Sequence, residues 1–317
     1  MDKVSVVIPT YNCLPYLPKA IESILAQDYK NIEILVVNDN SSDGTDKYLA
    51  TLSKTRNNII VINTDGVGAA SARNIAIKQS SGHYVAFLDA DDYWYSGKVS
   101  EQVRVHQENK HLGMTFTNYD HLNENNELII DCLAYWNKYN SDQHTVHFFD
   151  NPLNDIFANN IIGTSTVMIN KAVFQKLGFF NEEMSYCEDW HFWLKVCEHF
   201  DVALLKHSYT GYLMRAGSIT QTDSKRWNNL LSVSEVISHY QDRNTSISKK
   251  SLSQARARLQ EGYADYFRTK GDIYTALLHD FHSLLIDPQT RRVKHTLGDM
   301  KKCLMPSQKH KQSVPIK

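Results

Sequence analysis

The sequence has no long hydrophobic run, since none of its apolar stretches approaches the roughly 18 to 20 residues that a membrane-spanning helix requires. Cysteine is scarce as well. The five cysteines are odd in number and form no Cys-x-x-Cys pair, which indicates neither a disulfide framework nor a zinc site and fits a reducing cytoplasm. No signal peptide is expected, because a strand-like run begins already at Val4.

An excess of charge of one sign is also missing. The 34 Lys and Arg residues nearly balance the 35 Asp and Glu residues, so the formal net charge is −1 and nucleic acid is not expected as a partner. With 317 residues, 42% of them hydrophobic, the chain can bury a sizeable core without disulfides or metals. We therefore expect an ordinary globular protein of one large domain or two.

The first hundred residues alternate between short Val/Ile-rich runs and helical spacing, which predicts an α/β fold with a mainly parallel central sheet flanked by helices. The four expected strands are Val4–Ile8, Ile32–Val37, Ile59–Ile62 and Tyr84–Leu88. Ligands bind outside the carboxyl ends of such strands. Polar turns that begin at Pro9, Asn38 and Asp89 follow three of them.

The later pattern is looser. Strands are expected at Met114–Tyr119, Glu127–Trp136, Thr166–Ile169 and Val202–Leu205, and helices at Lys98–Glu108, Lys171–Leu177 and Asp189–Phe200. Asn137–Asp150 fits no element and is expected to be mobile or to face an acceptor. Beyond about Asp223 the periodicity is only helical, with breaks at Asn244–Lys249 and Gly271, which predicts three or four helices.

The most specific local feature is Asp89-Ala90-Asp91-Asp92, three carboxylates directly after a buried strand. Their mutual repulsion is costly unless a cation neutralises it, and oxygen ligands select Mg²⁺ or Mn²⁺. A solvated acidic turn that caps the next helix is the alternative. On the motif alone both interpretations are open.

Two further turns carry candidate ligands. Asp39 lies nearest the tip of its strand and can accept a hydrogen bond from a base or ribose, whereas Asp43 is expected to cap a helix. The run Gly66–Asn74 resembles a dinucleotide-binding fingerprint only superficially, because Ser71 replaces the third glycine and the turn follows the third strand. Arg73 in this run can reach a nucleotide or a phosphate.

An acidic pair, Glu188-Asp189, opens a predicted helix and is flanked by aromatic residues that include Trp190. Favourable placement at the positive end of the helix dipole explains such a pair without any function. A general base acting on a sugar hydroxyl is the alternative, since aromatic faces raise the basicity of a carboxylate and stack on sugars.

These pieces, in this order, resemble the family-2 inverting glycosyltransferases of the GT-A fold, of the kind that builds bacterial surface polysaccharides. The resemblance runs from Val4 to about Thr220. It implies that the run Ser5–Asn12 is the opening strand, that Asp39 meets the base, and that Asp189 is the catalytic base. The remaining implied residues are Pro9, Thr10, Tyr11, Arg73 and Asp89 at the nucleotide, Asp91 at the metal, and Asp92, Glu188, Trp190 and Arg215 as donor or acceptor contacts.

Two positions depart from the family pattern. Asn40 replaces the second Asp of the family's Asp-Asp-x-Ser turn, which leaves Asp39 in place. In the segment Tyr212–Thr220, Arg215 stands where a His near the diphosphate is common, and an arginine can clamp a diphosphate in bidentate fashion.

The resemblance implies a GT-A domain over residues 1–222, with a nucleotide-binding half (1–110) and an acceptor-binding half (111–222), followed by a helical region (223–317) with a basic tail. The implied reaction moves a sugar from a nucleotide-sugar donor to a hydroxyl of a saccharide or lipid-linked saccharide. The favoured donor is UDP-hexose or UDP-N-acetylhexosamine, and the implied cofactor is Mn²⁺ or Mg²⁺. A silent nucleotide-sugar binding module and a dinucleotide-dependent oxidoreductase are the alternatives.

The basic tail runs from Arg291 to Lys317. Such runs of positive charge are most often exposed to solvent and have no binding partner. A lipid-linked acceptor favours instead a peripheral contact of this tail with an anionic membrane, which predicts a cytoplasmic protein at the inner face of the plasma membrane.

Overall fold

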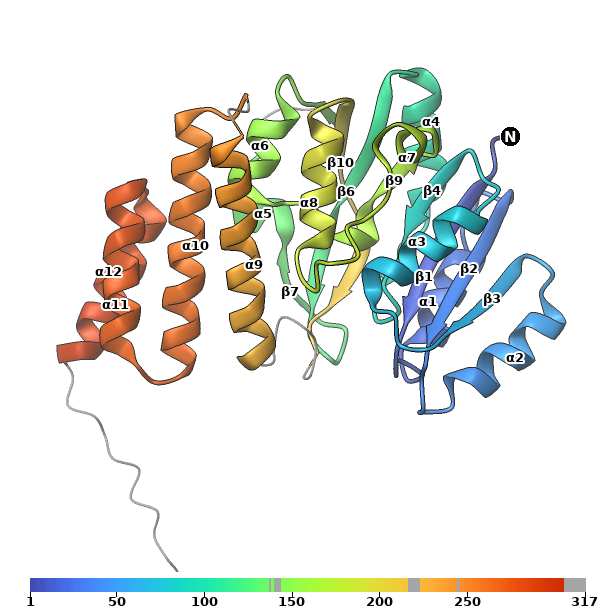
Figure 1. Cartoon of the computed structure of the whole chain (residues 1–317), viewed down its shortest axis with the longest axis horizontal. Coiled ribbons are helices and arrows are strands. Elements are labelled where there is room, and N and C mark those ends of the chain that lie inside the picture. The colour runs from blue at the N-terminus through green and yellow to red at the C-terminus, as the bar shows by residue number, and fades with distance from the viewer. Residues whose placement is uncertain (137, 140–143, 216–222, 244–245, 305–317) are drawn as a thin grey trace, which may run out of the picture. The chain divides into compact units, whose positions relative to one another are not determined.

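The computed structural model describes residues 1–136, 138–139, 144–215, 223–243 and 246–304 (Figure 1). The chain divides into two compact units, residues 1–222 and residues 223–317.

The first unit is built on one mixed sheet, with the strand order β3-β2-β1-β4-β9-β6-β10-β5; β7 pairs with β6 and β8 with β10. The strands are β1 (Val4–Thr10), β2 (Ile32–Asp39), β3 (Ile59–Thr64), β4 (Tyr84–Phe87), β5 (Tyr93–Trp94), β6 (Leu112–Leu122), β7 (Leu128–Asp131), β8 (Val146–Phe148), β9 (Met168–Asn170) and β10 (Asp201–Leu213). Neighbours are parallel from β3 to β4 and between β6 and β10, and these pairs hold most of the paired residues. The predicted α/β class is confirmed.

Helices pack on both faces of the parallel part because its strands are apolar on both sides. The helices and the short 3₁₀ turn of this unit are α1 (Leu17–Leu25), α2 (Thr45–Thr55), α3 (Ala69–Gln79), α4 (Lys98–Glu108), α5 (Cys132–Trp136), α6 (Pro152–Asn159), η1 (Thr164–Thr166), α7 (Ala172–Leu177) and α8 (Glu188–Cys197).

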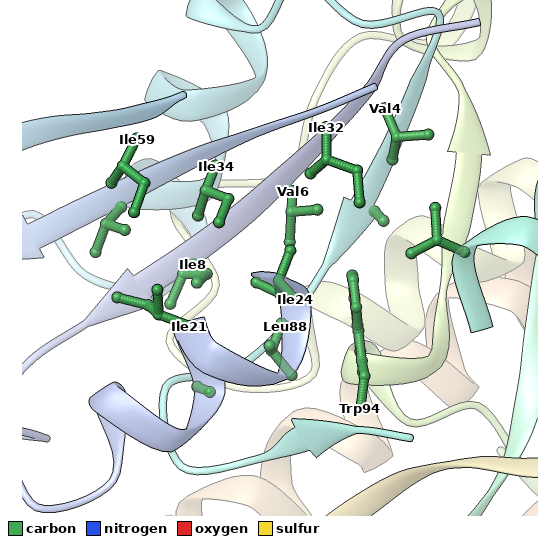
Figure 2. Close-up of a cluster of buried hydrophobic side chains, with 14 of the residues drawn as sticks. Val4, Val6, Ile8, Ile21, Ile24, Ile32, Ile34, Ile59, Leu88 and Trp94 are labelled. Carbon is green, nitrogen blue, oxygen red and sulfur yellow. The ribbon is translucent and has the colours of Figure 1, made fainter. Parts of the chain in front are cut away.

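The core beside α1 follows from the two-residue period of the strands. Val4, Val6 and Ile8 of β1 are fully buried in one cluster with Ile21 and Ile24 of α1 (Figure 2). Each fully buried side chain of this size contributes about 1.5 to 3 kcal/mol relative to exposure. This packing fixes β1 in the middle of the parallel strands, so the turn after Thr10 is held at the carboxyl edge of the sheet.

Three expectations for the later part of this unit need correction. The strand expected at Glu127–Trp136 ends at Asp131, where α5 begins, because Asp131 Oδ1 accepts a hydrogen bond from Ala134 N at 2.8 Å. The strand expected to begin at Thr166 begins at Met168, after η1. The strand expected at Val202–Leu205 extends to Leu213 through register shifts in its pairing with β6. Of the unassigned stretch, residues 137 and 140–143 lie outside the described residues, and β8 pairs with β10.

The second unit is helical, as expected, with α9 (Asp223–Asp242), α10 (Lys249–Thr269), α11 (Ile273–Ile286) and α12 (Thr290–Leu304). The break after α10 is made by Gly271 at φ +78°, followed by Asp272, whose side chain accepts from Thr275 N at the start of α11. The lysines of the tail after residue 304 lie outside the described residues.

Candidate functional site

Three strand ends meet at one edge of the sheet. Because β2, β1 and β4 are adjacent and parallel, the residues that follow them lie together: Thr10 is level with Asn38, and Asp89 comes two residues after β4. The two turns are also tied directly, since Asn12 N donates to Ser41 Oγ at 3.0 Å and Ser42 N donates to Asn12 Oδ1 at 2.8 Å. This edge contains the polar turns that the sequence singled out.

Arg73 links two acidic motifs that are far apart in the chain. Arg73 is 5% exposed, and the two terminal nitrogens of its guanidinium donate to Asp89 Oδ1 at 2.8 Å and to Glu188 Oε1 at 2.6 Å. Burial alone would lower the pKa of Arg73, but the carboxylates of Asp89 and Glu188 outweigh burial and raise it. Burial raises the pKa of Glu188, and Arg73 opposes that rise. In this structure Arg73 therefore holds the acidic strand end against the start of α8.

The next residue, Asn74, strengthens the same link. Its side-chain amide donates to Phe180 O at 2.9 Å and accepts from Phe180 N at 3.0 Å, on the segment that leads into α8. The Arg73-Asn74 pair thus binds the helix after β3 to both ends of the segment 180–188, which directly precedes the predicted catalytic base.

The three aspartates of the acidic run have different environments. Asp92 is 3% exposed, and its oxygens accept from Ser165 Oγ at 2.6 Å and Leu213 N at 3.0 Å. Burial and the nearby Asp91 raise the pKa of Asp92 well above its usual range. Both oxygens of Asp92 lie inside the protein and tie the acidic run to η1 and β10, so its predicted contact with donor or acceptor stays a prediction without a free oxygen in this structure.

Asp91, the predicted metal ligand, is paired with a cation of the protein. Arg215 Nε donates to Asp91 Oδ2 at 2.8 Å, and the guanidinium lies 4.9 Å from the centre of the Tyr16 ring and 3.4 Å from Cys13 Sγ. Burial raises the pKa of Asp91, and Asp89 adds to the rise while Arg215 opposes it. Of the segment Tyr212–Thr220, residues 216–220 lie outside the described residues.

A divalent cation at the acidic run needs several oxygen ligands. Within the described ranges, no three His, Cys, Asp or Glu side chains are gathered closely enough to hold a metal by themselves. Mg²⁺ and Mn²⁺ sites of enzymes that use nucleotides commonly take one or two carboxylates plus phosphate oxygens. Asp91, with Asp89 two residues before it, fits a metal shared with a bound diphosphate but not a site made by the protein alone.

Asp189, the predicted base, is half-buried on the first turn of α8. Its Oδ2 accepts from Thr164 Oγ1 at 2.8 Å, and its Oδ1 accepts from Trp190 N at 2.6 Å. The residue before α8, Cys187, has φ +59°, a conformation that non-glycine residues adopt with some strain. These contacts set the carboxylate in one orientation at the start of the helix.

Trp190 does not offer a face to a sugar. It is 1% exposed, its indole Nε1 donates to Ile156 O at 3.3 Å, and its ring stacks on Phe157 at 5.8 Å between centroids. The side chain belongs to the core between α6 and α8, and the predicted donor or acceptor contact at Trp190 stays a prediction that this packing does not support.

Asp39 organises the glycine-rich turn. Its Oδ1 accepts from Thr64 Oγ1 at 2.6 Å and from two backbone amides, Gly66 N at 3.0 Å and Val67 N at 2.7 Å; its Oδ2 accepts from Gly68 N at 2.8 Å. Burial alone would raise the pKa of Asp39, but these hydrogen bonds lower it. Gly66 and Gly68 have φ near +87°, so the glycines serve a turn around a carboxylate and the turn does not require a dinucleotide.

The turn after β1 contains an unpartnered polar atom. Thr10 is 3% exposed, and its Oγ1 has no hydrogen-bond partner among the described residues. Pro9 is partly buried beside it, and Tyr11 is 62% exposed. A buried hydroxyl next to an exposed aromatic ring suits a ligand that stacks and supplies one polar group. Asp43, by contrast, is structural, since it accepts from Leu14 N at 2.9 Å and from Thr45 Oγ1 at 2.7 Å.

Two residues of η1 that contact the site were not predicted from the sequence. Ser165 accepts from Asp89 N at 3.0 Å and donates to Asp92, while Thr164 donates to Asp189. One short turn therefore touches both the acidic run and the predicted base. The available signal was the cluster Gly163-Thr164-Ser165, which is typical of a turn, although nothing local indicates its partners.

The chain is similar to glycosyltransferases of known sequence. The model of the family described as glycosyl transferase family 2 matches residues 5–177. The Escherichia coli UDP-Glc:alpha-D-GlcNAc-diphosphoundecaprenol beta-1,3-glucosyltransferase WfgD is 29% identical over 224 residues, which are 70% of this chain and 81% of that protein. The chain spans only 35% and 58% of the length of two uncharacterized glycosyltransferases, from Rickettsia felis and Rickettsia prowazekii.

Solved structures agree in fold. TarS 1-349 from S. aureus, in complex with UDP-GlcNAc, has a TM-score of 0.63 at 19% identity and covers 93% of this chain and 83% of its own. The mannosyltransferase PcManGT from Pyrobaculum calidifontis, in complex with GDP-Man and Mn²⁺, has a TM-score of 0.65 at 16% identity and covers 96% and 81%. Both likenesses concern the fold alone, and they confirm the predicted GT-A architecture. With the family match over more than half of its length, the chain belongs to glycosyl transferase family 2.

Proposed function

We propose that this chain is an inverting glycosyltransferase that moves a sugar from a nucleotide-sugar donor to a hydroxyl group of an acceptor. The observation that carries the proposal is Arg73, which joins Asp89 of the acidic run to Glu188, the neighbour of Asp189. A transferase must hold a donor and a general base in one fixed geometry. The buried arginine supplies such a connection between two motifs that are far apart in the chain.

In the proposed reaction Asp189 takes the proton of the acceptor hydroxyl as that oxygen attacks the anomeric carbon. Its Oδ2 is held by Thr164, and the half-buried position leaves the carboxylate open to an acceptor. The nucleoside diphosphate leaves from the opposite face, so a single displacement inverts the anomeric centre. A second carboxylate nucleophile, as in two-step retaining hydrolases, is not needed.

A divalent metal, Mn²⁺ or Mg²⁺, would be held by Asp91 with Asp89 nearby. When bound, such an ion neutralises the charge that develops on a leaving diphosphate. Arg215 is the second positive group at this place, and its permanent charge suits it to clamp the diphosphate once it is released from Asp91. At the other end of the donor, Thr10, Tyr11 and Asp39 are proposed to receive the nucleoside.

UDP-hexose or UDP-N-acetylhexosamine is the proposed donor, and a lipid-linked saccharide at the inner face of the plasma membrane the proposed acceptor. The name of WfgD, with UDP-Glc and a GlcNAc-diphosphoundecaprenol acceptor, supports both. The UDP-GlcNAc complex of TarS supports a uridine nucleotide. Asp39 supports it as well, because it stands where the family meets the base.

The test is a donor screen by mass spectrometry with UDP-, GDP- and dTDP-sugars, offered with a GlcNAc-diphospholipid analogue, with and without Mn²⁺ or Mg²⁺. We expect product from a UDP-sugar only in the presence of metal, with an inverted anomeric centre by NMR. UDP binding without turnover of any donor would favour the silent binding module. Binding of NAD or NADP without binding of UDP would favour the oxidoreductase.

A further inference from the structure

Helix α11 buries its polar side and exposes its apolar side. The inward residues Ala276, Asp280 and Ser283 are at most 3% exposed. The outward residues follow one stripe at spacings of four, three and four, and they are exposed by 41 to 80%: Tyr274, Leu278, Phe281 and Leu285. A helix of a water-soluble bundle normally shows the reverse pattern.

Helix α12 repeats this inversion. Arg292, Thr296 and Asp299 are buried, whereas Val293, Leu297 and Met300 are exposed by 37 to 58% at spacings of four and three. Two consecutive helices with the same inverted pattern indicate a binding surface, because single exposed apolar residues are common but a continuous apolar stripe is not.

The two stripes share one side of the second unit. Both polar sides face α10: Ser283 donates to Ala257 O at 2.9 Å, and Arg268 of α10 pairs with Asp280 at 3.1 Å and with Asp299 at 2.9 Å. Arg292 of α12 likewise pairs with Glu261 of α10 at 3.2 Å. The opposite sides of α11 and α12 therefore both point away from α10, and the two helices lie next to each other in Figure 1. We call the seven exposed residues Tyr274, Leu278, Phe281, Leu285, Val293, Leu297 and Met300 the apolar face.

The exposed charged side chains of α12 beside the apolar face are positive. Lys294 and Lys301 are exposed beside the α12 stripe, whereas the acids of the two helices, Asp280 and Asp299, are buried in pairs with Arg268. The sequence after residue 304 adds three lysines and no acid. A second copy of this chain would bring the same positive charges against each other, whereas an anionic surface complements them.

We propose that the apolar face docks in the plane of a bilayer that contains anionic phospholipids, with Lys294 and Lys301 at the headgroups. Helices with one apolar and one cationic side lie in the membrane interface rather than across it. Among the described residues, no helix combines the length and apolar character needed to cross a bilayer. The inference deepens the proposed function, since a lipid-linked acceptor lies at such a surface, but it concerns a surface made by the second unit alone.

Flotation of the full chain with vesicles tests the proposal. The vesicles contain phosphatidylcholine alone or with phosphatidylglycerol, and the variant is L278Q/L285Q/L297Q, in which glutamine preserves helix propensity. The control is Leu231→Gln, an equally conservative change at an exposed leucine (42%) of α9 outside the face. We expect binding to the mixed vesicles, lowered at least about tenfold in the triple variant and unchanged in the control.

A charge variant, K294Q/K301Q, completes the design. Its affinity for the mixed vesicles is expected to fall on the order of tenfold, while its weak binding to phosphatidylcholine stays the same. Equal flotation of the triple variant and the wild type would overturn the proposal. A second result would also overturn it: the wild type binds no vesicles and is a dimer in light scattering, whereas the triple variant is a monomer. That result would assign the face to contact with a second copy of the chain. Circular dichroism verifies the helices of each variant.

The two proposals can fail separately. Transfer to a water-soluble acceptor analogue needs no membrane, so the triple variant is expected to match the wild type in that assay. If the wild type binds anionic vesicles but turns over no donor, the proposed function fails and the docking face stands. If the wild type transfers sugar but does not float with vesicles, the docking face fails and the proposed function stands.

Discussion

Arg215 Nε donates a hydrogen bond to Asp91 Oδ2 at 2.8 Å, so the carboxylate that is expected to bind a metal is neutralised by an arginine of the protein itself. The side chains are about one-fifth exposed, and the pair lies beside the Asp89 carboxylate. A divalent ion at Asp91 must compete with this arginine. Because both carry positive charge, they cannot share the carboxylate closely, and release of Arg215 frees its guanidinium for a diphosphate.

The first prediction concerns this competition. Arg215→Gln removes the internal cation, so the weak attraction of Mn²⁺ to Asp91 in the donor-free protein is expected to increase about three- to tenfold, as measured by electron paramagnetic resonance of free Mn²⁺. The affinity for UDP in the presence of saturating Mn²⁺ is expected to fall by a similar factor. The control is Arg104→Gln, which breaks an exposed pair with Glu101 and Glu108. Mn²⁺ affinity unchanged in Arg215→Gln would show that the pair does not compete.

The second prediction concerns the base. Asp189→Asn keeps the shape of the side chain and its hydrogen bond from Trp190 N but cannot take a proton. We expect kcat to fall by about 10² to 10⁴, with UDP affinity by calorimetry within twofold of the wild type, about the error of the comparison. Turnover near the wild-type rate would remove Asp189 from this role.

The third prediction concerns a positioning residue. Thr164 Oγ1 donates to Asp189 Oδ2 at 2.8 Å from a buried position in η1. Thr164→Val has nearly the same volume but no hydroxyl, and it is expected to lower kcat about tenfold while KM for the donor stays constant. Thr164→Ser restores the hydroxyl that donates the hydrogen bond to Asp189 and should restore kcat. If serine fails to rescue, the effect comes from packing of the methyl group and not from the hydrogen bond.

The fourth prediction concerns Arg73. Arg73→Met leaves the carboxylates of Asp89 and Glu188 without their counter-charge, so the free energy of unfolding is expected to fall by about 3 kcal/mol in urea titrations. Glu188→Gln in the same chain removes one of these charges. The double variant R73M/E188Q should therefore lose less than the sum of the two single variants. Strict additivity would mean that the two side chains do not interact.

The sequence predicted the edge of the sheet at which the motifs meet. The near-continuous apolar runs of β1, β2 and β4 mark parallel strands, and parallel strands bring the residues after their ends together regardless of their distance in the chain. This rule placed Thr10, Asp39 and Asp89 correctly relative to the sheet, because it depends only on short-range pattern and topology.

The sequence could not predict which oxygens face outward. Asp91 and Asp92 are adjacent and chemically identical, yet one pairs with Arg215 at the site and the other is buried against Ser165. Trp190 follows the base by one residue and points into the core. Partners such as Glu188 for Arg73, 115 residues away, depend on how α8 packs against the sheet, and no local pattern encodes that contact.

The last prediction concerns acid stability. Glu33 of β2 is 5% exposed and accepts from Lys3 Nζ and Ser81 N, each at 2.6 Å, and from Ser81 Oγ at 2.8 Å. Burial alone would raise its pKa, but these partners, together with Ser5 Oγ, which also donates to the carboxylate, lower the pKa of Glu33 to about 2. A carboxylate whose pKa is lower in the folded state stabilises the fold above its unfolded pKa, and this contribution is lost as the pH falls toward the folded pKa.

The contribution of Glu33 should therefore be complete at neutral pH and disappear between about pH 4.5 and pH 2. Allowing for solvent screening at the partly exposed Lys3, it amounts to about 2 kcal/mol. Glu33→Gln is expected to lower the free energy of unfolding by that amount at pH 7, and the difference from the wild type should narrow as the pH approaches 2. Glu101→Gln, at an exposed glutamate of α4, serves as the control. A difference that stays constant from pH 7 to pH 2 would assign the loss at Glu33 to packing and not to its charge.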